Sequence, residues 1–221
     1  MTSPAPSSVA AALHTSRGLA RLIELAEATP LQPACDAFYF LRHGQTPRNA
    51  LRIFQSYDEP LSELGEQQAA AAATALAREP IRNIVCSDAR RALHTAQTVA
   101  AALGLQPQLA QPLRERHFGA LVGTSSADID WDCAPEGGET LAQFVDRKRQ
   151  ALQAALEVEG PVLIVAHGGS LYVLAALLGV PVSMSIMANA HPLHFTRQAD
   201  GWHARSLMGV EPTAAAGAAL A

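Results

Sequence analysis

Short apolar runs alternate with longer amphipathic stretches through the middle of the chain. Strands are expected in the apolar runs 37–41, 81–86 and 162–166, with a weaker one at 108–111. Helices are expected over 62–78, 88–103, 139–157 and 170–178. Because strands that alternate with helices are typical of βαβ units, the pattern predicts an α/β fold. The expected architecture is a three-layer αβα sandwich with a mostly parallel central sheet.

Residues at the ends of these elements support the assignment. Ser62 can cap the helix that follows it, and Gly104 and Gly179 can end helices because glycine readily adopts left-handed backbone angles. Near the end of the chain, 193–197 and 202–206 are expected to form a hairpin. Ligands in such sheets bind beyond the carboxyl ends of the strands, so the residues that follow each strand are the first candidates for chemistry.

The two ends of the chain differ from its middle. Residues 1–8 are rich in Ser and Pro and are expected to be disordered, whereas 9–28 has helical composition and apolar spacing. This helix could pack on the main domain or bind a partner, and an ordinary appended helix is the simpler interpretation. The sequence thus predicts an N-terminal extension (1–34), one main domain (35–210) and a flexible Ala-rich tail (211–221).

Charge narrows the range of partners. The net charge is −4 and the pI is near 6.0, which argues against a nucleic-acid partner because such binding needs a basic face. An anionic ligand must then be held by a local cationic pocket.

Cysteine usage and hydropathy narrow the range of locations. Cys35, Cys86 and Cys133 show neither CxxC nor zinc-type spacing, so we expect reduced thiols and no metal site. The chain has no apolar run long enough to predict a membrane span, and its start lacks the basic region of a secretory signal. We therefore expect a cytoplasmic protein with no membrane partner.

Polar residues that suit phosphate chemistry follow three of the predicted strands. Arg42 and His43 follow the first, residues 87–91 follow the second, and His167 follows the strand at 162–166. A single histidine beside a strand is more often structural than catalytic, but structural roles at all three places would require three coincidences. Two histidines and an arginine pair are therefore expected to line one edge of the sheet.

A series of ordered motifs between about residues 37 and 208 resembles the histidine phosphatase (phosphoglycerate mutase-like) superfamily. The Arg-His-Gly tripeptide alone would be weak evidence, whereas the ordered set is specific. The matching stretches are Leu41-Arg42-His43-Gly44-Gln45-Thr46 with Asn49, Pro60-Leu61-Ser62-Glu63-Leu64-Gly65, Ser87-Asp88-Ala89-Arg90-Arg91-Ala92 with Thr95-Ala96, Glu115-Arg116-His117-Phe118-Gly119, Gly138-Glu139-Thr140, and Val165-Ala166-His167-Gly168.

The resemblance implies a role for each of five residues and requires neither a metal nor another cofactor. His43 would be the nucleophile, Glu115 the proton donor, and Arg42, Arg91 and His167 the phosphate pocket. Physical reasoning agrees with these roles. The arginines can supply planar paired donors to the phosphoryl oxygens, and a protonated His167 would add a third positive group.

The nucleophile itself needs one free ring nitrogen. A neutral imidazole attacks phosphorus through that nitrogen if an acceptor holds the other N–H. Gly44, directly after His43, is expected to leave room for the close approach of the phosphoryl group. Gln45, Thr46 and Asn49 could either bond the substrate or shape the loop, and the sequence does not separate these alternatives.

Two assignments have competing interpretations. Arg91 rather than Arg90 is expected in the pocket, because the family places its arginine directly before a small residue and consecutive helical residues point about 100° apart. Glu115 could instead form a surface salt bridge with Arg114 or Arg116.

The predicted function is hydrolysis of a small phosphorylated metabolite. A cofactor-dependent phosphoglycerate mutase is one alternative, because 115–121 looks mutase-like, and a non-catalytic phospho-ligand binding protein is another. The segment between Gly119 and Gly138 is shorter than the insertion of such mutases, so the pocket should be open to water unless the helix at 9–28 forms a lid. The sequence does not identify the substrate, and specificity for it is expected to lie in the loop 123–137. The sequence also does not show whether the protein forms a homodimer.

Overall fold

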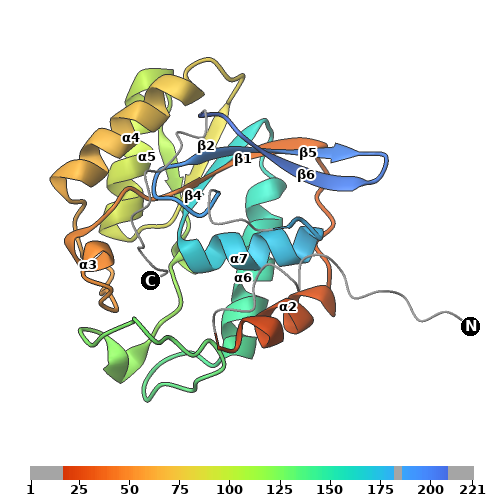
Figure 1. The fold of residues 1–221 in the computed structure, drawn as a ribbon. Helices are drawn as coiled ribbons and strands as arrows, with labels where there is room; N and C mark the ends of the chain where they lie inside the picture. Colours follow the sequence, from red (N-terminus) through yellow and green to blue (C-terminus); the bar gives the residue numbers. More distant parts are fainter. Residues whose placement is uncertain (1–16, 182–185, 209–221) are drawn as a thin grey trace, which may run out of the picture.

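A six-stranded mixed sheet forms the centre of the computed structural model, which describes residues 17–181 and 186–208 (Figure 1). The strand order is β3-β2-β4-β1-β5-β6. The first four strands in this order are mutually parallel, and β5 and β6 are antiparallel to their neighbours, which confirms a mostly parallel sheet. The strands are β1 (Ala37–Arg42), β2 (Asn83–Cys86), β3 (Pro107–Leu109), β4 (Val162–Ala166), β5 (Pro192–Gln198) and β6 (Gly201–Ser206).

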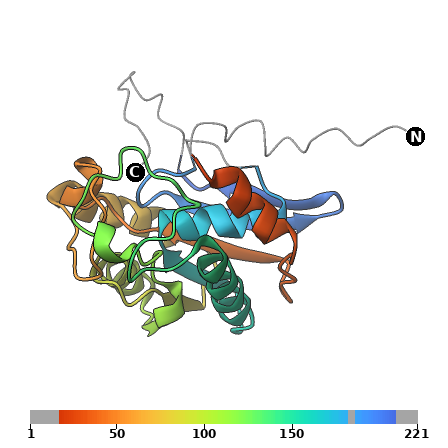
Figure 2. The same cartoon turned by 90° about the horizontal axis from the view of Figure 1, so that it is seen from below.

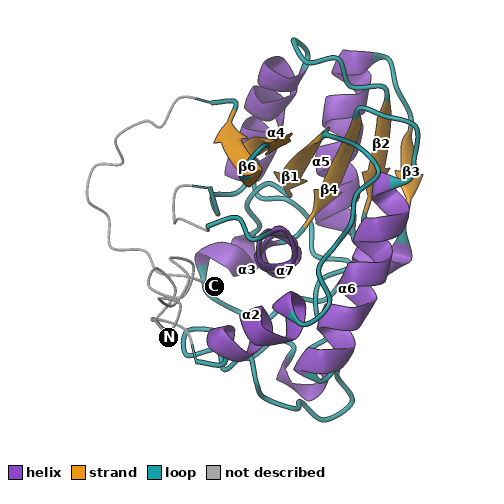
Figure 3. Ribbon diagram, turned by 90° about the vertical axis from the view of Figure 1, so that its right-hand side faces the viewer, coloured by secondary structure: helices purple, strands orange, loops and turns teal. Residues whose placement is uncertain are grey.

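Helices cover both faces of the sheet, which confirms the three-layer αβα architecture (Figure 3). One face carries α4 (Glu63–Leu76) and α5 (Arg90–Leu103), and the other carries α2 (Leu19–Glu27), α6 (Leu141–Leu156) and α7 (Gly168–Leu178). The connections contain the short helix α3 (Pro47–Ala50) and two 3₁₀ helices, η1 (Gln111–Leu113) and η2 (Gly119–Leu121).

Alternation along β1 divides its side chains between two apolar cores. Phe38 and Phe40 belong to the core beneath α2, α6 and α7, and Tyr39 and Leu41 belong to the core beneath α4 and α5. Successive side chains of a strand point to opposite faces, so a strand buried on both faces must be apolar throughout. β4, whose residues are all buried, follows the same rule.

Capping residues begin and end the helices where the sequence predicts. The Ser62 hydroxyl accepts a hydrogen bond from the Gly65 N–H at 3.1 Å, and Thr140 forms a reciprocal capping box with Gln143. Gly104 and Gly179 adopt left-handed angles, with φ of 68° and 67°, and end α5 and α7.

The N-terminal helix differs from its expected range of 9–28. It begins at Leu19, because Gly18 has a left-handed φ of 75° and cannot continue a helix, and residues 9–16 lie outside the described ranges. Leu22 and Ala26 are fully buried, and α2 packs against α6 and α7 (Figure 2). The structure therefore favours the appended helix that packs on the domain.

Other boundaries also need correction. The strand expected at 108–111 is β3, which pairs with β2 only as far as Leu109, because the chain turns into η1 at Gln111. The last helix begins at Gly168, earlier than the expected 170. The remaining predicted elements match to within about two residues, and α3, η1 and η2 were not predicted. No helix within 17–181 or 186–208 has the length and apolar character needed to cross a membrane.

Candidate active site

The ends of three adjacent parallel strands form the floor of one site. Arg42 at the end of β1 pairs in register with Ala166 of β4, and Cys86 at the end of β2 pairs with Val165. The residues that follow these strands are held to the same edge, since the His43 N–H donates to the Ala166 carbonyl at 3.0 Å. The expected meeting of His43, residues 87–91 and His167 is therefore present in the fold.

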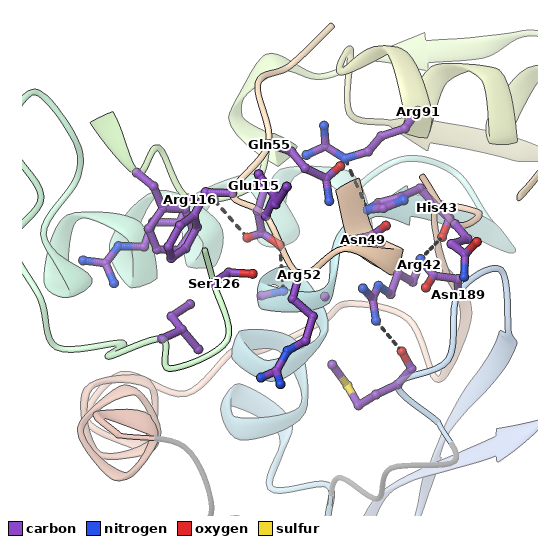
Figure 4. Close-up of a pocket in the computed structure, with 18 of the residues that line it drawn as sticks. Arg42, His43, Asn49, Arg52, Gln55, Arg91, Glu115, Arg116, Ser126 and Asn189 are labelled. Atoms are coloured by element: carbon purple, nitrogen blue, oxygen red, sulfur yellow. Dashed lines mark hydrogen bonds between the residues drawn. The ribbon is translucent and has the colours of Figure 1, made fainter. Parts of the chain in front are cut away.

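His43 has one ring nitrogen locked and the other directed to the cavity. Its Nδ1 lies 2.7 Å from the Gly44 carbonyl, which can only accept, so Nδ1 carries the proton and Nε2 keeps a lone pair. The Arg91 Nε donates to this Nε2 at 3.3 Å (Figure 4). Burial, followed by the charges of Arg91 and Arg42, holds the pKa of His43 well below its usual value of 6.5. The imidazole is therefore neutral at physiological pH.

Arg91, rather than Arg90, faces the site. Arg91 is almost fully buried, and its Nη1 donates to the Ser56 carbonyl at 2.8 Å, whereas Arg90 is exposed. Burial lowers the pKa of Arg91 to about 10, so the guanidinium remains charged at neutral pH. A cation buried beside His43 is suited to bind an anionic ligand.

Arg42 supplies a second cation from the end of β1. Its Nη1 donates to the Met187 carbonyl at 2.6 Å, and its buried Nε has no hydrogen-bond partner within the described part of the chain. Burial lowers the pKa of Arg42 from its ordinary value. A buried donor without an acceptor costs stability until a ligand supplies one, so this edge of Arg42 is prepared for an anion.

His167 lies behind His43 and differs from the expectation in its charge. The two rings are 5.2 Å apart between centroids, and His167 Nε2 lies 2.9 Å from the Ser87 hydroxyl. Burial and then the charges of Arg91 and other neighbouring groups hold the pKa of His167 well below 6.5, so it is neutral in the unliganded protein. A bound phosphate dianion would have to restore the proton expected there.

Gly44 is needed for packing. A Cβ at this position would lie 2.3 Å from the Gly65 carbonyl oxygen, so glycine permits the close contact with the start of α4. The Gly44 N–H donates to the Thr95 hydroxyl at 3.1 Å. The backbone after His43 is thereby held between α4 and α5.

Glu115 reaches the cavity and forms neither of the salt bridges considered. Its two carboxylate oxygens accept hydrogen bonds from the backbone N–H groups of Arg116 at 2.9 Å and Gly169 at 2.8 Å. The Arg114 side chain pairs with Asp88 instead, and the Arg116 guanidinium donates to backbone carbonyls. Glycine at position 169 leaves room for this carboxylate, because a Cβ there would lie 2.4 Å from a Glu115 oxygen.

Two neighbouring basic residues on α6 hold the segment that carries Glu115, and neither was predicted from sequence. Arg147 donates to the Pro112 carbonyl at 2.6 Å and to the Arg114 carbonyl at 2.9 Å, and it pairs with Glu139. The ammonium group of Lys148, which is fully buried, donates to the Arg114 carbonyl as well. Burial holds the pKa of Lys148 well below its ordinary value.

The three polar residues after the nucleophile separate into two groups. Thr46 is fully buried, and its hydroxyl accepts from the Asn49 N–H at 3.0 Å in the capping box of α3 and donates to Gln55 at 2.9 Å. Thr46 therefore shapes the loop, whereas Gln45 and Asn49 line the cavity.

The cavity above these residues has a volume of about 620 Å³. The loop at 123–137 forms part of its wall. No residue of α2 lines it, and residues 9–16 of the segment considered as a lid lie outside the described ranges. Seven polar or aromatic lining residues outside the matched motifs were not predicted: Arg52, Phe54, Gln55, Ser126, Trp131, Tyr172 and Asn189.

Known proteins are similar to this chain over most of its length. A model of the histidine phosphatase superfamily (branch 1) matches residues 38–208. The glucosyl-3-phosphoglycerate phosphatase of Mycolicibacterium vanbaalenii is 38% identical over 168 residues, which cover 64% of this chain and 74% of that protein. A Serratia proteamaculans protein named probable phosphoglycerate mutase GpmB is 34% identical over 161 residues, covering 65% of this chain and 75% of its own length.

Solved structures agree with the sequence relatives. Mycobacterial glucosyl-3-phosphoglycerate phosphatase Rv2419c in complex with VO3 has a TM-score of 0.64 at 32% identity, covering 78% of this chain and 97% of that chain. Its complex with inorganic phosphate has a TM-score of 0.61 at 31% identity, covering 78% and 95%.

Proposed function

The chain belongs to the histidine phosphatase superfamily, and from this premise we propose that it hydrolyses phosphomonoesters through a covalent phosphohistidine on His43, without a metal. The observation that carries the proposal is the state of His43: a buried, neutral imidazole whose Nδ1–H is fixed on Gly44 and whose Nε2 lone pair faces Arg91 at the cavity. Such a nitrogen is a nucleophile at neutral pH without the help of a separate base.

In the first step, the Nε2 lone pair attacks phosphorus and the bond between phosphorus and the ester oxygen breaks. Arg91 turns its donors from Nε2 to the phosphoryl oxygens as the substrate enters, and the unpartnered Nε of Arg42 supplies another donor. Stabilisation of the charge that spreads over these oxygens is the main requirement of phosphoryl transfer. Loss of one preorganised donor of this kind typically costs about 3 kcal/mol of transition-state stabilisation.

Glu115 gives the leaving oxygen a proton as the ester bond breaks. In the second step, water attacks the phosphohistidine, passes a proton to the Glu115 carboxylate and releases inorganic phosphate, which restores neutral His43. This role is supported by the place of the carboxylate: among the described residues each of its two oxygens accepts one hydrogen bond, which leaves a lone pair for a proton.

The substrate is proposed to be a small phosphorylated metabolite with a sizeable polar alcohol part. The cavity of about 620 Å³ falls in the range of pockets that hold ligands much larger than phosphate alone. Two of the relatives described above are named for the hydrolysis of glucosyl-3-phosphoglycerate, which makes sugar and glycerate phosphates the first compounds to test.

The test of the proposal is phosphate release in EDTA from nitrophenyl phosphate and from a panel of phosphorylated metabolites. Turnover in EDTA supports metal-independent hydrolysis, and its absence with every compound would favour a phospho-ligand binding protein. His43→Asn is the matched variant, and it should be inactive with all compounds.

A phosphoglycerate mutase remains the second candidate, because relatives named GpmB match the chain. A coupled enolase assay with 3-phosphoglycerate and added 2,3-bisphosphoglycerate separates the two reactions. Mutase turnover at least about tenfold above phosphate release would replace the first proposal with this one.

The organisation of the protein is proposed on the same basis. Residues 35–210 would form the catalytic domain, with 1–34 as an extension whose described helix packs on it. The range 211–221 lies outside the described residues. We also propose a cytoplasmic location. Light scattering tests whether the protein forms a homodimer.

A further inference from the structure

Arg52 is a cation at the cavity that the proposed phosphoryl transfer does not use. It follows α3, and its side chain lines the cavity together with that of Ser126. Figure 4 shows the guanidinium extending away from His43 and Arg91, which lie at the phosphoryl end of the site.

The backbone at Arg52 is held in an unusual conformation. Its φ of 54° lies in the left-handed region, which side-chain-bearing residues seldom adopt. Two hydrogen bonds between residues 52–54 and the loop at 123–137 hold this conformation. The Ser126 N–H donates to the Arg52 carbonyl at 2.7 Å, and the Phe54 N–H donates to the Thr124 carbonyl at 3.0 Å. The side chain therefore enters the cavity from a fixed position.

The guanidinium of Arg52 has donors to spare. One Nη2 hydrogen bonds to the Ala127 carbonyl, while the buried Nε has no partner. Within residues 17–181 and 186–208, no carboxylate lies within ion-pair distance of it, whereas Arg48 pairs with Glu59 at 3.2 Å. Buried donors usually have an acceptor, so the unpartnered Nε points to a ligand.

We propose that Arg52 is a specificity-determining residue that binds a carboxylate on the alcohol part of the substrate. The inference rests on the proposed phosphatase function and narrows its substrate class to phosphomonoesters that carry a carboxylate. Arg42 and Arg91 account for the phosphoryl charge at the other end of the cavity. The unpartnered Nε of Arg52 can donate to one carboxylate oxygen, and the charge of the guanidinium matches that of one carboxylate.

A matched pair of substrates tests this assignment. 3-Phosphoglycerate and its carboxamide have the same leaving oxygen and differ in the charge of the carboxyl group. The ratio of their kcat/KM values is measured in the wild-type protein and in Arg52→Gln, Arg52→Lys and Arg48→Gln. Arg48→Gln is the control, because Arg48 loses the same charge nearby but is already paired with Glu59 and does not line the cavity.

We expect the kcat/KM of the wild-type protein to be higher for 3-phosphoglycerate than for its carboxamide by about tenfold or more, because a hydrogen bond to a charged group contributes that much to binding. Arg52→Gln should reduce this preference to about twofold or less, Arg52→Lys should keep part of it, and Arg48→Gln should keep all of it. Arg52→Gly adopts a φ of 54° without strain and replaces the glutamine variant if that variant does not fold. An unchanged preference in Arg52→Gln, or no preference in the wild-type protein, would overturn the inference.

Failure of the proposed function gives a different result. In that case the wild-type protein releases no phosphate from either compound or from nitrophenyl phosphate. Calorimetric binding of the two compounds to His43→Asn then measures the preference without turnover. Tighter binding of 3-phosphoglycerate than of its carboxamide, lost when Arg52 is replaced, supports the inference without turnover. Equal affinities for the two compounds contradict it.

Discussion

Arg91 Nε donates a hydrogen bond to His43 Nε2 across 3.3 Å, so the nitrogen proposed to attack phosphorus is already in contact with a cation proposed to hold the phosphoryl group. The contact has two effects on the imidazole. It aims the lone pair of Nε2 into the cavity, and the positive charge of Arg91 opposes protonation of the ring.

Arg91→Gln should therefore change the pH dependence as well as the rate. Neutral His43 is the reactive form, and its lowered pKa places the acid limb of kcat/KM well below pH 6.5. Without the Arg91 charge the pKa of His43 rises, so the acid limb should move to higher pH and the maximal rate should fall about a hundredfold or more. Stopped assays between pH 4.5 and 8 measure both. Arg90→Gln, which removes an exposed charge from the next position, should shift neither, and an unmoved limb in Arg91→Gln would contradict the role of the contact.

Glu115→Gln should lose activity in proportion to the need of the leaving group for a proton. Alkyl phosphates release a basic alkoxide, whereas nitrophenyl phosphate releases a stable anion. We expect a loss of about a hundredfold or more with alkyl phosphates and of less than about tenfold with nitrophenyl phosphate. Steady-state kinetics with both substrates checks this. Equal losses would indicate that Glu115 only supports the structure of the site.

Lys148→Met tests the support beneath Glu115. The buried ammonium group donates to the Arg114 carbonyl, directly before the proton donor, and methionine keeps the apolar stem without the donor. The expected loss of activity with alkyl phosphates is about three to ten times larger than the loss with nitrophenyl phosphate. This is the pattern of Glu115→Gln in weaker form. Arg149→Met on the same helix is the control, since Arg149 pairs only with Asp146 at the surface. A uniform loss on both substrates would assign Lys148 to stability alone.

Buried neutral histidines should make the protein less stable in acid. The pKa values of His43 and His167 are lowered in the folded state, so below about pH 6.5 the unfolded chain binds more protons than the folded one. Stability therefore falls as the pH drops below about 6.5, by up to about 1.4 kcal/mol per pH unit for each histidine, until the folded-state pKa is reached. Urea unfolding between pH 7.5 and 5 measures the slope. His43→Asn should have a shallower slope than the wild-type protein, whereas His203→Gln, at the exposed hairpin, should not; identical slopes in all three would contradict the lowered pKa of His43.

The parts of this account that sequence could predict depend on local pattern. The apolar runs of β1, β2 and β4 identified the sheet, and the residues after each strand identified where chemistry would gather. The choice of Arg91 over Arg90 followed from the family resemblance, which places the arginine directly before a small residue, whereas helical geometry says only that the two side chains point about 100° apart.

The remaining features depend on contacts between segments far apart in the chain. The need for glycine at Gly44 comes from Gly65, and the neutral state of His167 comes from burial beside Arg91. The support of Glu115 by Lys148 joins η1 to α6, and nothing in either segment alone indicates it. Likewise, Arg52 reads as an ordinary loop charge until its φ and its missing partner are known.

The most direct test of the central claim is to trap and map the phosphoenzyme. The protein is mixed with radiolabelled substrate, quenched within the first turnovers, and digested for mass spectrometry under alkaline conditions. The account predicts a phosphoryl group on His43 that is labile in acid and stable in alkali, as a phosphoramidate is, and that is absent from His43→Asn, whose turnover is abolished. An acid-stable label, a label on another residue, or undiminished turnover in His43→Asn would contradict it.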